Sequence, residues 1–402
     1  MSIKIKQLKR QAQKLNQRVK LAYTQARKRK KWKLNTLQFS LELESNCLKL
    51  AKEIEKRQYN IKPSLAFICF QPIKREIFAG DFRDRVVHHY VFTKLYHHYD
   101  KLLINDCYSC RLNKGTGYGI KRANSYLRSV SSNFKKPAYV LKLDISGYFM
   151  SINRDVLYQI NKDLIKKIFK NNEYEKSTLL YLLKKIIFND PTLNCKIKGK
   201  HQDWYKLPKN KSLFFAKNNC GLPIGNLTSQ LFGNIYLNGL DHYIKEKLKC
   251  RYYGRYVDDM FFMHEDKEFL KDLIPKISKY LQDNLSLELH PQKIYLQEIN
   301  KGLPFLGAII KPHRIYPGKR IIKSFREKIS LVVERKLTNP SFFNSYLGQL
   351  KKYNSYNLRK KIMTEAKTVL ALEILKYEVN DNYSKIEPKK TLFSHDRATG
   401  NE

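Results

Sequence analysis

Two adjacent carboxylates, Asp258 and Asp259, lie between two aromatic runs of the chain, residues 251–256 and 260–263. Tyrosine and phenylalanine favour strands, so this stretch predicts a β-hairpin with both carboxylates at its tip. Neighbouring carboxylates repel each other, and a bound cation relieves that repulsion. Mg²⁺ prefers hard oxygen ligands of this kind. An ordinary turn explains the pair equally well, because aspartate is common in turns.

A third carboxylate follows another predicted strand. In residues 140–145, alternation places Lys142 and Asp144 on one face and the aliphatic side chains on the other. Asp144 therefore ends a half-buried strand and faces away from the core. A helix is expected next, with Asn153 as its N-cap. Three carboxylates held on rigid strands suit phosphoryl transfer, in which one metal ion activates a 3′-hydroxyl and a second binds the triphosphate.

The charge of the chain indicates a polyanionic partner. It carries 78 Lys and Arg against 36 Asp and Glu, a net charge of +42, which repels itself unless an anion shares it. Nucleic acid is the natural partner, because neutralised phosphates release counterions. An anionic membrane is the rival, but the basic residues are not confined to one amphipathic helix. Apolar runs are short and the first residues lack a signal core, so a cytoplasmic protein without membrane contact is expected.

Cysteine and histidine spacing argues against a zinc site. Cys107 and Cys110 have ligand-like spacing but lack a second pair, and zinc sites normally have four ligands. Reduced and mostly buried thiols are expected for the seven cysteines. The paired histidines at 88–89 and 97–98 are expected on a helix surface or at an interface.

Composition divides the chain into segments. Residues 1–58 are basic and helical, and the run at 27–31 is either a solvated helix face or an RNA contact. Residues 187–219 are interpreted as a long basic loop. Residues 320–378 are basic and helical, and the tail from Asn380 is polar and expected to fray.

A glycine-rich turn opens a further helix. Gly221 and Gly225 enclose a proline, which predicts close approach of the backbone to a partner. Thr228 or Ser229 is the expected cap of the helix that follows.

The order of these segments resembles that of the reverse transcriptases. The matching motifs run from about residue 60 to 310 in the family's order: a fingers motif, the first catalytic motif, the signature box and the two motifs after the box. They are residues 81–87 after Lys74-Arg75, residues 141–152, 256–259, 290–293 and 303–307.

The resemblance implies a metal-dependent active site. It makes Asp144, Asp258 and Asp259, together with the carbonyl of Ile145, the ligands of two Mg²⁺ ions, with Mn²⁺ as an alternative. Asp258 is expected to be the more direct ligand of the adjacent pair.

The resemblance also implies roles in nucleotide binding. Arg75 would contact the triphosphate, and Phe149 would block a ribose 2′-hydroxyl. Ile224 and Gly225 would line the nucleotide pocket, and Lys293 would donate a proton to pyrophosphate. Each of the three larger side chains has a structural alternative: an ion pair with a neighbouring acidic group for Arg75, core packing for Phe149 and a surface position for Lys293.

One motif is similar to a particular subfamily. Ile224-Gly-Asn-Leu-Thr-Ser-Gln230 replaces the Gln-Gly and Ser-Pro of most reverse transcriptases and is similar to the enzymes of diversity-generating retroelements. That similarity implies cDNA synthesis from a template RNA, a primer strand and dNTPs, errors opposite template adenines, and a small basic accessory protein. A defence-associated bacterial reverse transcriptase and a non-catalytic RNA-binding scaffold are the alternatives.

The implied fold is an α+β right-hand polymerase with fingers, a palm with an antiparallel sheet and a helical thumb. Expected boundaries are a basic helical extension at 1–58, fingers and palm at 59–310, a thumb at 311–380 and a polar tail at 381–402.

Overall fold

The computed structural model of the chain describes residues 2–71 and 73–389, with side chains from residue 13 onward. Pro72, which precedes the fingers motif, and residues 390–402 of the expected tail lie outside the described residues. The described part combines helices with mostly antiparallel sheets, which confirms the predicted α+β class.

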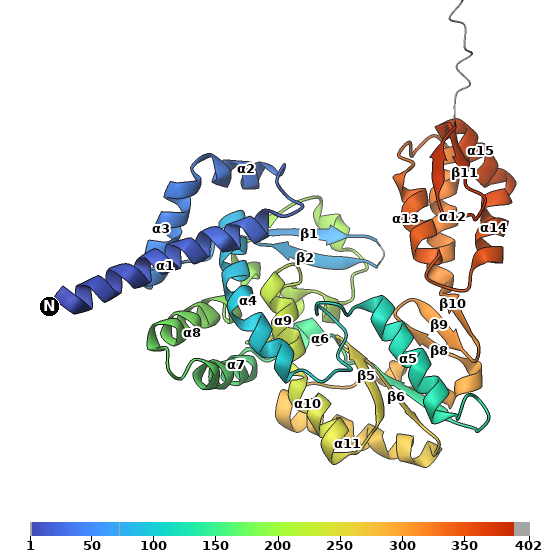
Figure 1. Ribbon diagram of the computed structural model, residues 1–402, viewed down its shortest axis with the longest axis horizontal. Helices are drawn as coiled ribbons and strands as arrows, with labels where there is room; N and C mark the ends of the chain where they lie inside the picture. Colours follow the sequence, from blue (N-terminus) through green and yellow to red (C-terminus); the bar gives the residue numbers. More distant parts are fainter. Residues whose placement is uncertain (1, 72, 390–402) are drawn as a thin grey trace, which may run out of the picture. The chain divides into compact units, whose positions relative to one another are not determined.

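The chain forms two compact units, Met1–Gly115 with Leu141–Leu296, and Thr116–Val140 with Gln297–Glu402. This division does not follow the expected linear boundaries, because residues 116–140 group with the C-terminal part and the basic N-terminal helices group with the first unit. Figure 1 labels helices and strands of both units.

The predicted hairpin belongs to a four-stranded sheet. Its strands are β5 (Tyr252–Tyr256) and β6 (Asp259–His264), which pair antiparallel with Tyr256 opposite Asp259. The sheet order is β5-β6-β3-β7, with β3 at Tyr139–Leu143 and β7 at Tyr295–Glu298. Tyr253 and Phe262 are fully buried and stack with ring centroids 4.9 Å apart, so aromatic burial fixes the hairpin as its composition predicts.

The first unit also contains ten α-helices among its described residues, of which α11 (Lys267–Leu285) packs against β6. Asn153 caps its helix as predicted, accepting hydrogen bonds from the backbone N–H groups of Asp155 and Val156. No helix among the described residues has the length and apolar character needed to cross a membrane. The helices of this unit are α1 (Ser2–Arg27), α2 (Leu34–Leu41), α3 (Leu43–Glu55), α4 (Phe82–Leu102), α6 (Tyr148–Ser151), α7 (Arg154–Ile168), α8 (Glu173–Ile187), α9 (Leu227–Tyr236), α10 (Asn238–His242) and α11 (Lys267–Leu285).

A second sheet corrects one expectation. It has the order β2-β1-β4, from β2 (Arg75–Ala79), β1 (Leu65–Cys69) and β4 (Lys196–Ile197). β4 and several short 3-10 helices come from residues 187–219, which were expected to form a loop. The physical reason is Glu76, a fully buried carboxylate on β2. It accepts hydrogen bonds from Trp204 Nε1 at 2.7 Å and from the Leu213 backbone N–H at 2.6 Å, so the segment folds against it.

The second unit builds its own core. It contains α5 (Thr116–Val130), β8 (Leu303–Phe305), β9 (Ala308–Lys311), β10 (Arg314–Pro317), α12 (Lys319–Val333), α13 (Ser341–Leu350), α14 (Tyr356–Thr364), α15 (Ala366–Leu375), β11 (Tyr377–Val379) and β12 (Ile386–Pro388). β8, β9 and β10 form one antiparallel sheet.

The tail was expected to fray from Asn380, but its first part is ordered. β11 and β12 pair antiparallel, and Ile386 is buried in the core cluster with Phe325 and Phe343. The carboxamide oxygen of Asn380 accepts hydrogen bonds from the backbone N–H groups of Ser384 and Lys385, which closes the turn between the strands. The segment is held on the core by the buried Ile386, whose backbone N–H and carbonyl both bond to the Asn344 side chain, and by Arg359, which donates to the carbonyl of Tyr383.

Candidate active site

The tip of the hairpin contains a strained residue. Val257 and Asp258 form the turn between Tyr256 and Asp259, and Val257 has φ +59°. Two-residue hairpin turns require positive φ, but a β-branched side chain is unfavourable there. Such a conformation costs about 1–3 kcal/mol and persists only where neighbouring groups hold it.

Two side chains hold Val257 in this conformation. The Nη1 group of Arg255 donates a hydrogen bond to the Val257 carbonyl at 2.9 Å, and Ser109 Oγ accepts one from the Val257 N–H at 3.2 Å. Ser109 is held in turn by Asn234, whose Oδ1 accepts from Ser109 Oγ at 2.7 Å. These contacts fix the backbone that carries Asp258 and Asp259.

Arg255 is itself held by a buried ion pair. Arg255 and Asp241, on α10, are both fully buried, and Arg255 Nε donates to Asp241 Oδ1 at 2.7 Å. The hydroxyl of Tyr253 donates to the same oxygen at 2.6 Å. A buried charge is tolerated only with such partners, so α10 is locked to the hairpin.

The structure brings the three predicted carboxylates into one electrostatic site. Asp144 follows β3, and Asp258 and Asp259 lie at the hairpin tip. Burial, and then the charge of Asp144, raises the pKa of Asp258 to about 6. Burial also raises the pKa of Asp259 to about 6, against the opposing charge of Lys142 and with a contribution from Asp144. The carboxylates therefore disfavour each other's ionisation, as the sequence predicts for a site that binds cations.

Two lysines pair with this set. Lys293 Nζ lies 3.0 Å from Asp144 Oδ2, and Lys142 Nζ lies 3.0 Å from Asp259 Oδ1. Lys142 reaches the site because it shares the strand face of Asp144, as alternation predicts. The Asp144 and Asp259 side chains are 20% and 21% exposed, so an ion from solvent can reach them.

The carboxylate oxygens of the site are ligands of the type that a divalent cation binds. Asp259 Oδ1 is buried, and Lys142 Nζ lies 3.0 Å from it. A carboxylate oxygen that faces a cation beside other carboxylates is a hard ligand of the kind that Mg²⁺ prefers. Among the described residues, however, no three Asp, Glu, His or Cys side chains are grouped closely enough to hold one ion in this arrangement. The lysine pairs would have to open for an ion to bind.

The backbone around Ile145 is fixed by the segment that carries Lys293. The N–H of Ser146 donates to Glu288 O at 2.9 Å, and the N–H of His290 donates to Asp144 O at 2.8 Å. These bonds hold Asp144 and the buried Ile145 at the end of β3. They also place the short 3-10 helix Pro291–Lys293 beside Asp144.

The residues expected in the nucleotide pocket fall into two groups. Phe149 and Ile224 pack against one apolar cluster around Phe78. Gly225 has φ +129°, and a Cβ there would lie 2.7 Å from the Phe78 carbonyl, so this position requires glycine. Arg75, at the start of β2, is exposed and forms no ion pair within the described residues. Its charge acts on the Tyr256 hydroxyl, whose pKa is raised by burial and by Cys110 and lowered by Arg75.

The expected cap of α9 is wrong. The N-cap is Asn226, without a side-chain capping bond, and the helix begins at Leu227. Thr228 is instead buried, and its Oγ1 shares a hydrogen bond with Nδ1 of His88, 2.7 Å away. His88 is therefore a core residue and not a surface histidine.

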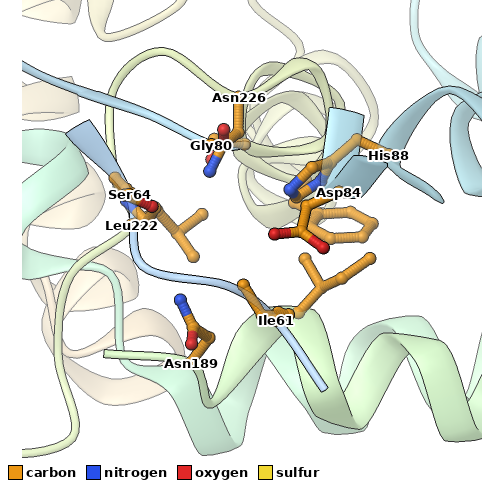
Figure 2. Close-up of a pocket in the computed structure, with 12 residues that line it drawn as sticks. Ile61, Ser64, Gly80, Asp84, His88, Asn189, Leu222 and Asn226 are labelled. Atoms are coloured by element: carbon orange, nitrogen blue, oxygen red, sulfur yellow. The ribbon is translucent and has the colours of Figure 1, made fainter. Parts of the chain in front are cut away.

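A small cavity lies behind the glycine-rich turn (Figure 2). Asp84, His88, Leu222 and Asn226 line it, and its volume is about 10 Å³. That is room for about one water molecule. Asn226 Oδ1 is buried without a hydrogen bond among the described residues, which marks it as a polar partner for such a water. The cavity is too small for a nucleotide.

His88 gives the fold a pH dependence. Burial, followed by the charges of His89 and Arg85, lowers the pKa of His88 to about 4. The unfolded chain therefore binds the proton more readily between the two pKa values, and stability falls as pH falls through this window. The free energy of unfolding, measured with urea, should therefore fall by about 2 kcal/mol between about pH 7.5 and about pH 5 because of His88. His88→Gln, which keeps a polar partner for Thr228, should show a correspondingly smaller loss. An equal loss in both proteins would contradict the assignment.

Four positioning residues were not found from the sequence: Ser109, Asn234, Asp241 and Arg255. Ser109 lies inside the Cys107–Cys110 segment, which had been weighed only as a metal motif. Its backbone pairs with the hairpin, since the Tyr108 N–H donates to Arg255 O at 2.9 Å. All seven cysteines are free thiols, as expected, but only three are buried.

Comparison with known proteins supports the family resemblance. The sequence profile described as "Reverse transcriptase (RNA-dependent DNA polymerase)" matches residues 82–310, more than half of the chain. No curated protein gives a match.

Telomerase structures are also similar to the chain. Apo telomerase from Candida tropicalis, truncated from its C-terminal domain, is 15% identical with a TM-score of 0.44, over 68% of this chain and 60% of that one. Telomerase from Candida albicans in complex with a fragment of telomeric RNA is 14% identical with a TM-score of 0.44, over 84% and 64%. The chain spans less than two thirds of either telomerase chain, and a likeness at this level says nothing of its function.

Proposed function

Because the chain belongs to the reverse transcriptases, the RNA-dependent DNA polymerases, we propose that it copies a template RNA into DNA by nucleotidyl transfer from dNTPs. The observation that carries the proposal is the pairing of Lys293 Nζ with Asp144 and of Lys142 Nζ with Asp259 beside Asp258, whose pKa is raised by burial and then by the Asp144 charge. A non-catalytic RNA-binding scaffold has no need of three mutually repelling carboxylates.

Asp144, Asp258 and Asp259, with the Ile145 carbonyl, would hold two divalent cations, Mg²⁺ or Mn²⁺. Such ions, when bound, lower the pKa of the attacking 3′-hydroxyl and neutralise the leaving pyrophosphate. Lys293, whose Nζ lies 3.0 Å from Asp144 Oδ2, would release that carboxylate and donate a proton to pyrophosphate. The hydrogen bonds to the Val257 backbone would hold the turn that carries Asp258 and Asp259 in place.

The remaining roles concern the nucleotide. Arg75 is exposed at the start of β2 and would contact the triphosphate. Phe149 and Ile224 share one apolar cluster, so we place the sugar against Phe149 and the base against Ile224. The Phe78 N–H donates to the Ile224 carbonyl at 2.8 Å, which keeps this turn on β2 beside Gly225.

Within the family, we propose an enzyme of a diversity-generating retroelement. Ile224 stands where most reverse transcriptases carry glutamine, and an aliphatic side chain cannot hydrogen-bond to the nucleotide. Weaker selection of the incoming nucleotide by residue 224 would produce errors at template adenines. A cytoplasmic location and a small basic accessory protein belong to the same proposal. A defence-associated reverse transcriptase is the second candidate, because it requires the same carboxylates.

Primer extension on a defined RNA containing all four bases, with Mg²⁺ and dNTPs, tests both levels of the proposal. Errors concentrated at template adenines are the expected result. Ile224→Gln should lower the adenine error rate by about two- to tenfold, the value of one hydrogen bond. Faithful cDNA would favour the defence candidate, and no cDNA even with the accessory protein would favour the scaffold.

Replacing Phe149 by alanine is expected to admit ribonucleotides. Phe149 packs against Gly233 and against Tyr148, with ring centroids 5.3 Å apart, so its ring is held in place. Removing the ring opens space for a 2′-hydroxyl, and the preference for dNTPs over rNTPs should fall roughly tenfold or more. Competition between the two nucleotide types measures this ratio. Phe169→Ala, at a partly exposed aromatic after α7 that packs on His98, is the control and should leave the ratio unchanged.

A further inference from the structure

The loop between α1 and α2 presents an exposed aromatic ring among cations. Residues 27–33 carry six Lys and Arg side chains around Trp32. All seven residues are exposed, and the Trp32 side chain is 78% exposed. Tryptophan normally buries most of its ring, so an exposed one within a basic run indicates a contact surface.

The loop is held in a defined shape. The Lys30 N–H donates to Arg27 O at 2.9 Å, and the Lys33 N–H donates to Lys30 O at 3.1 Å, which forms two successive turns. An aromatic cluster anchors the helices on either side. Tyr23 of α1 and Phe39 of α2 stack at 5.8 Å, and both rings contact Phe82 of α4. α1 also packs along α4 (Figure 1). A ligand would therefore meet a preformed surface.

The charges of the loop are not neutralised by acidic side chains. Residues 27–33 form no ion pair within the part of the chain that the structure describes. Burial, and then the nearby Arg85, lowers the pKa of Lys30. Burial lowers the pKa of His89 as well, with contributions from Lys30 and Arg85. Cations thus converge between the loop and α4, where burial lowers the pKa of Arg85 and the charge of Asp81 opposes that effect. An anionic ligand would relieve this repulsion.

We propose that residues 27–33 bind single-stranded RNA, with one base stacked on Trp32 and phosphates contacted by the surrounding cations. Stacking needs an unpaired base and an accessible aromatic face, and cations beside it follow the backbone. A duplex would offer the phosphates without an unpaired base. The site is separate from the carboxylate site and does not depend on the retroelement proposal. It is tested by binding alone, so failed polymerisation and failed binding are distinguishable.

The chain allows a direct test, because it contains two tryptophans, Trp32 and Trp204. Trp204 is kept because it donates to the buried Glu76, and the emission of Trp32 is the difference between the wild-type protein and full-length Trp32→Phe. An unstructured RNA of roughly 12 nucleotides should quench the emission of Trp32 saturably. An abasic oligomer of equal length should bind without equivalent quenching. RNA that binds with no change in Trp32 emission would overturn the proposal, and so would vesicles of anionic lipid that shift this emission while RNA does not.

Variants separate stacking from charge. Trp32→Ala should weaken RNA affinity about tenfold, and Trp32→Phe should weaken it less. Combined replacement of Lys28, Arg29 and Lys33 by glutamine, which leaves Lys31 over the Trp32 ring, should reduce the slope of log affinity against log salt by about 2. The matched control replaces Lys166, Lys167 and Lys170, exposed lysines at the end of α7, by glutamine. Equal effects from both triple variants, or wild-type affinity in Trp32→Ala, would show that the loop is not a specific site.

Discussion

Replacing Asp258 by asparagine is expected to lower the rate of primer extension about a thousand-fold. The substitution keeps the shape of the side chain and removes a charged oxygen ligand at the hairpin tip. Metal-assisted charge stabilisation contributes several kcal/mol to such reactions, and each 1.36 kcal/mol is tenfold in rate. Single-turnover extension with saturating Mg²⁺ and dNTPs measures this loss.

The same substitution should stabilise the fold when divalent ions are absent. The pKa of Asp258 in the folded chain is about 6, above the ordinary value of 3.8. The folded state therefore holds the proton more strongly, and stability falls as pH rises through the window between these values. At neutral pH the charge of Asp258 costs about 3 kcal/mol, which asparagine removes. Urea unfolding in a chelator should show Asp258→Asn to be the more stable protein.

Added Mg²⁺ should reverse this order, because it stabilises only a protein that binds it. Asp272→Asn, at an exposed carboxylate paired with Lys276, is the control and should change neither activity nor the response to Mg²⁺. A variant that is inactive and also destabilised in chelator would indicate a structural role for Asp258. A normal rate of primer extension by Asp258→Asn would show that Asp258 is not a ligand of a catalytic metal ion.

The local features of this site could be predicted from the sequence. Aromatic residues on both strands gave the hairpin, because their burial fixes the pairing that places Asp258 and Asp259 at the tip. Alternation in β3 placed Lys142 and Asp144 on one face, and the ion pair of Lys142 with Asp259 depends on that placement. Both inferences use periodicity within a few residues, which the backbone geometry enforces directly.

Contacts between distant segments could not be predicted in this way. Asp241 follows Leu240 in an ordinary helical pattern, and nothing near it in sequence shows that it meets Arg255. Glu76 looked like a neighbour available to Arg75, yet its carboxylate organises residues more than a hundred positions away. A buried charge has to find its partners anywhere in the fold, and local patterns carry no information on where they lie.

Removing the charge of Asp241 should have the second large effect, this time on stability. Asp241→Asn keeps the shape of the side chain but leaves Arg255 buried without a counter-charge. Breaking a buried ion pair from one side costs about 3–5 kcal/mol. Urea unfolding measures the loss, and Asp272→Asn again serves as the control, because an exposed ion pair contributes little. A loss below about 1 kcal/mol would mean that the pair is not a buried, mutually dependent one.

A rescue variant separates this stability from the positioning of the turn. The rescue variant replaces Arg255 by methionine, Asp241 by leucine and Tyr253 by phenylalanine. These apolar side chains fill the site, and the change at Tyr253 removes the hydroxyl that would otherwise lose its acceptor. Such exchanges restore stability to within about 1 kcal/mol or improve it. The variant still lacks the Arg255 bond to the Val257 carbonyl, so the strained turn loses a support. We therefore expect stability to recover while the extension rate stays about tenfold low, with little change in KM for dNTPs. Recovery of both would show that Arg255 holds α10 to the sheet and does not position the carboxylates.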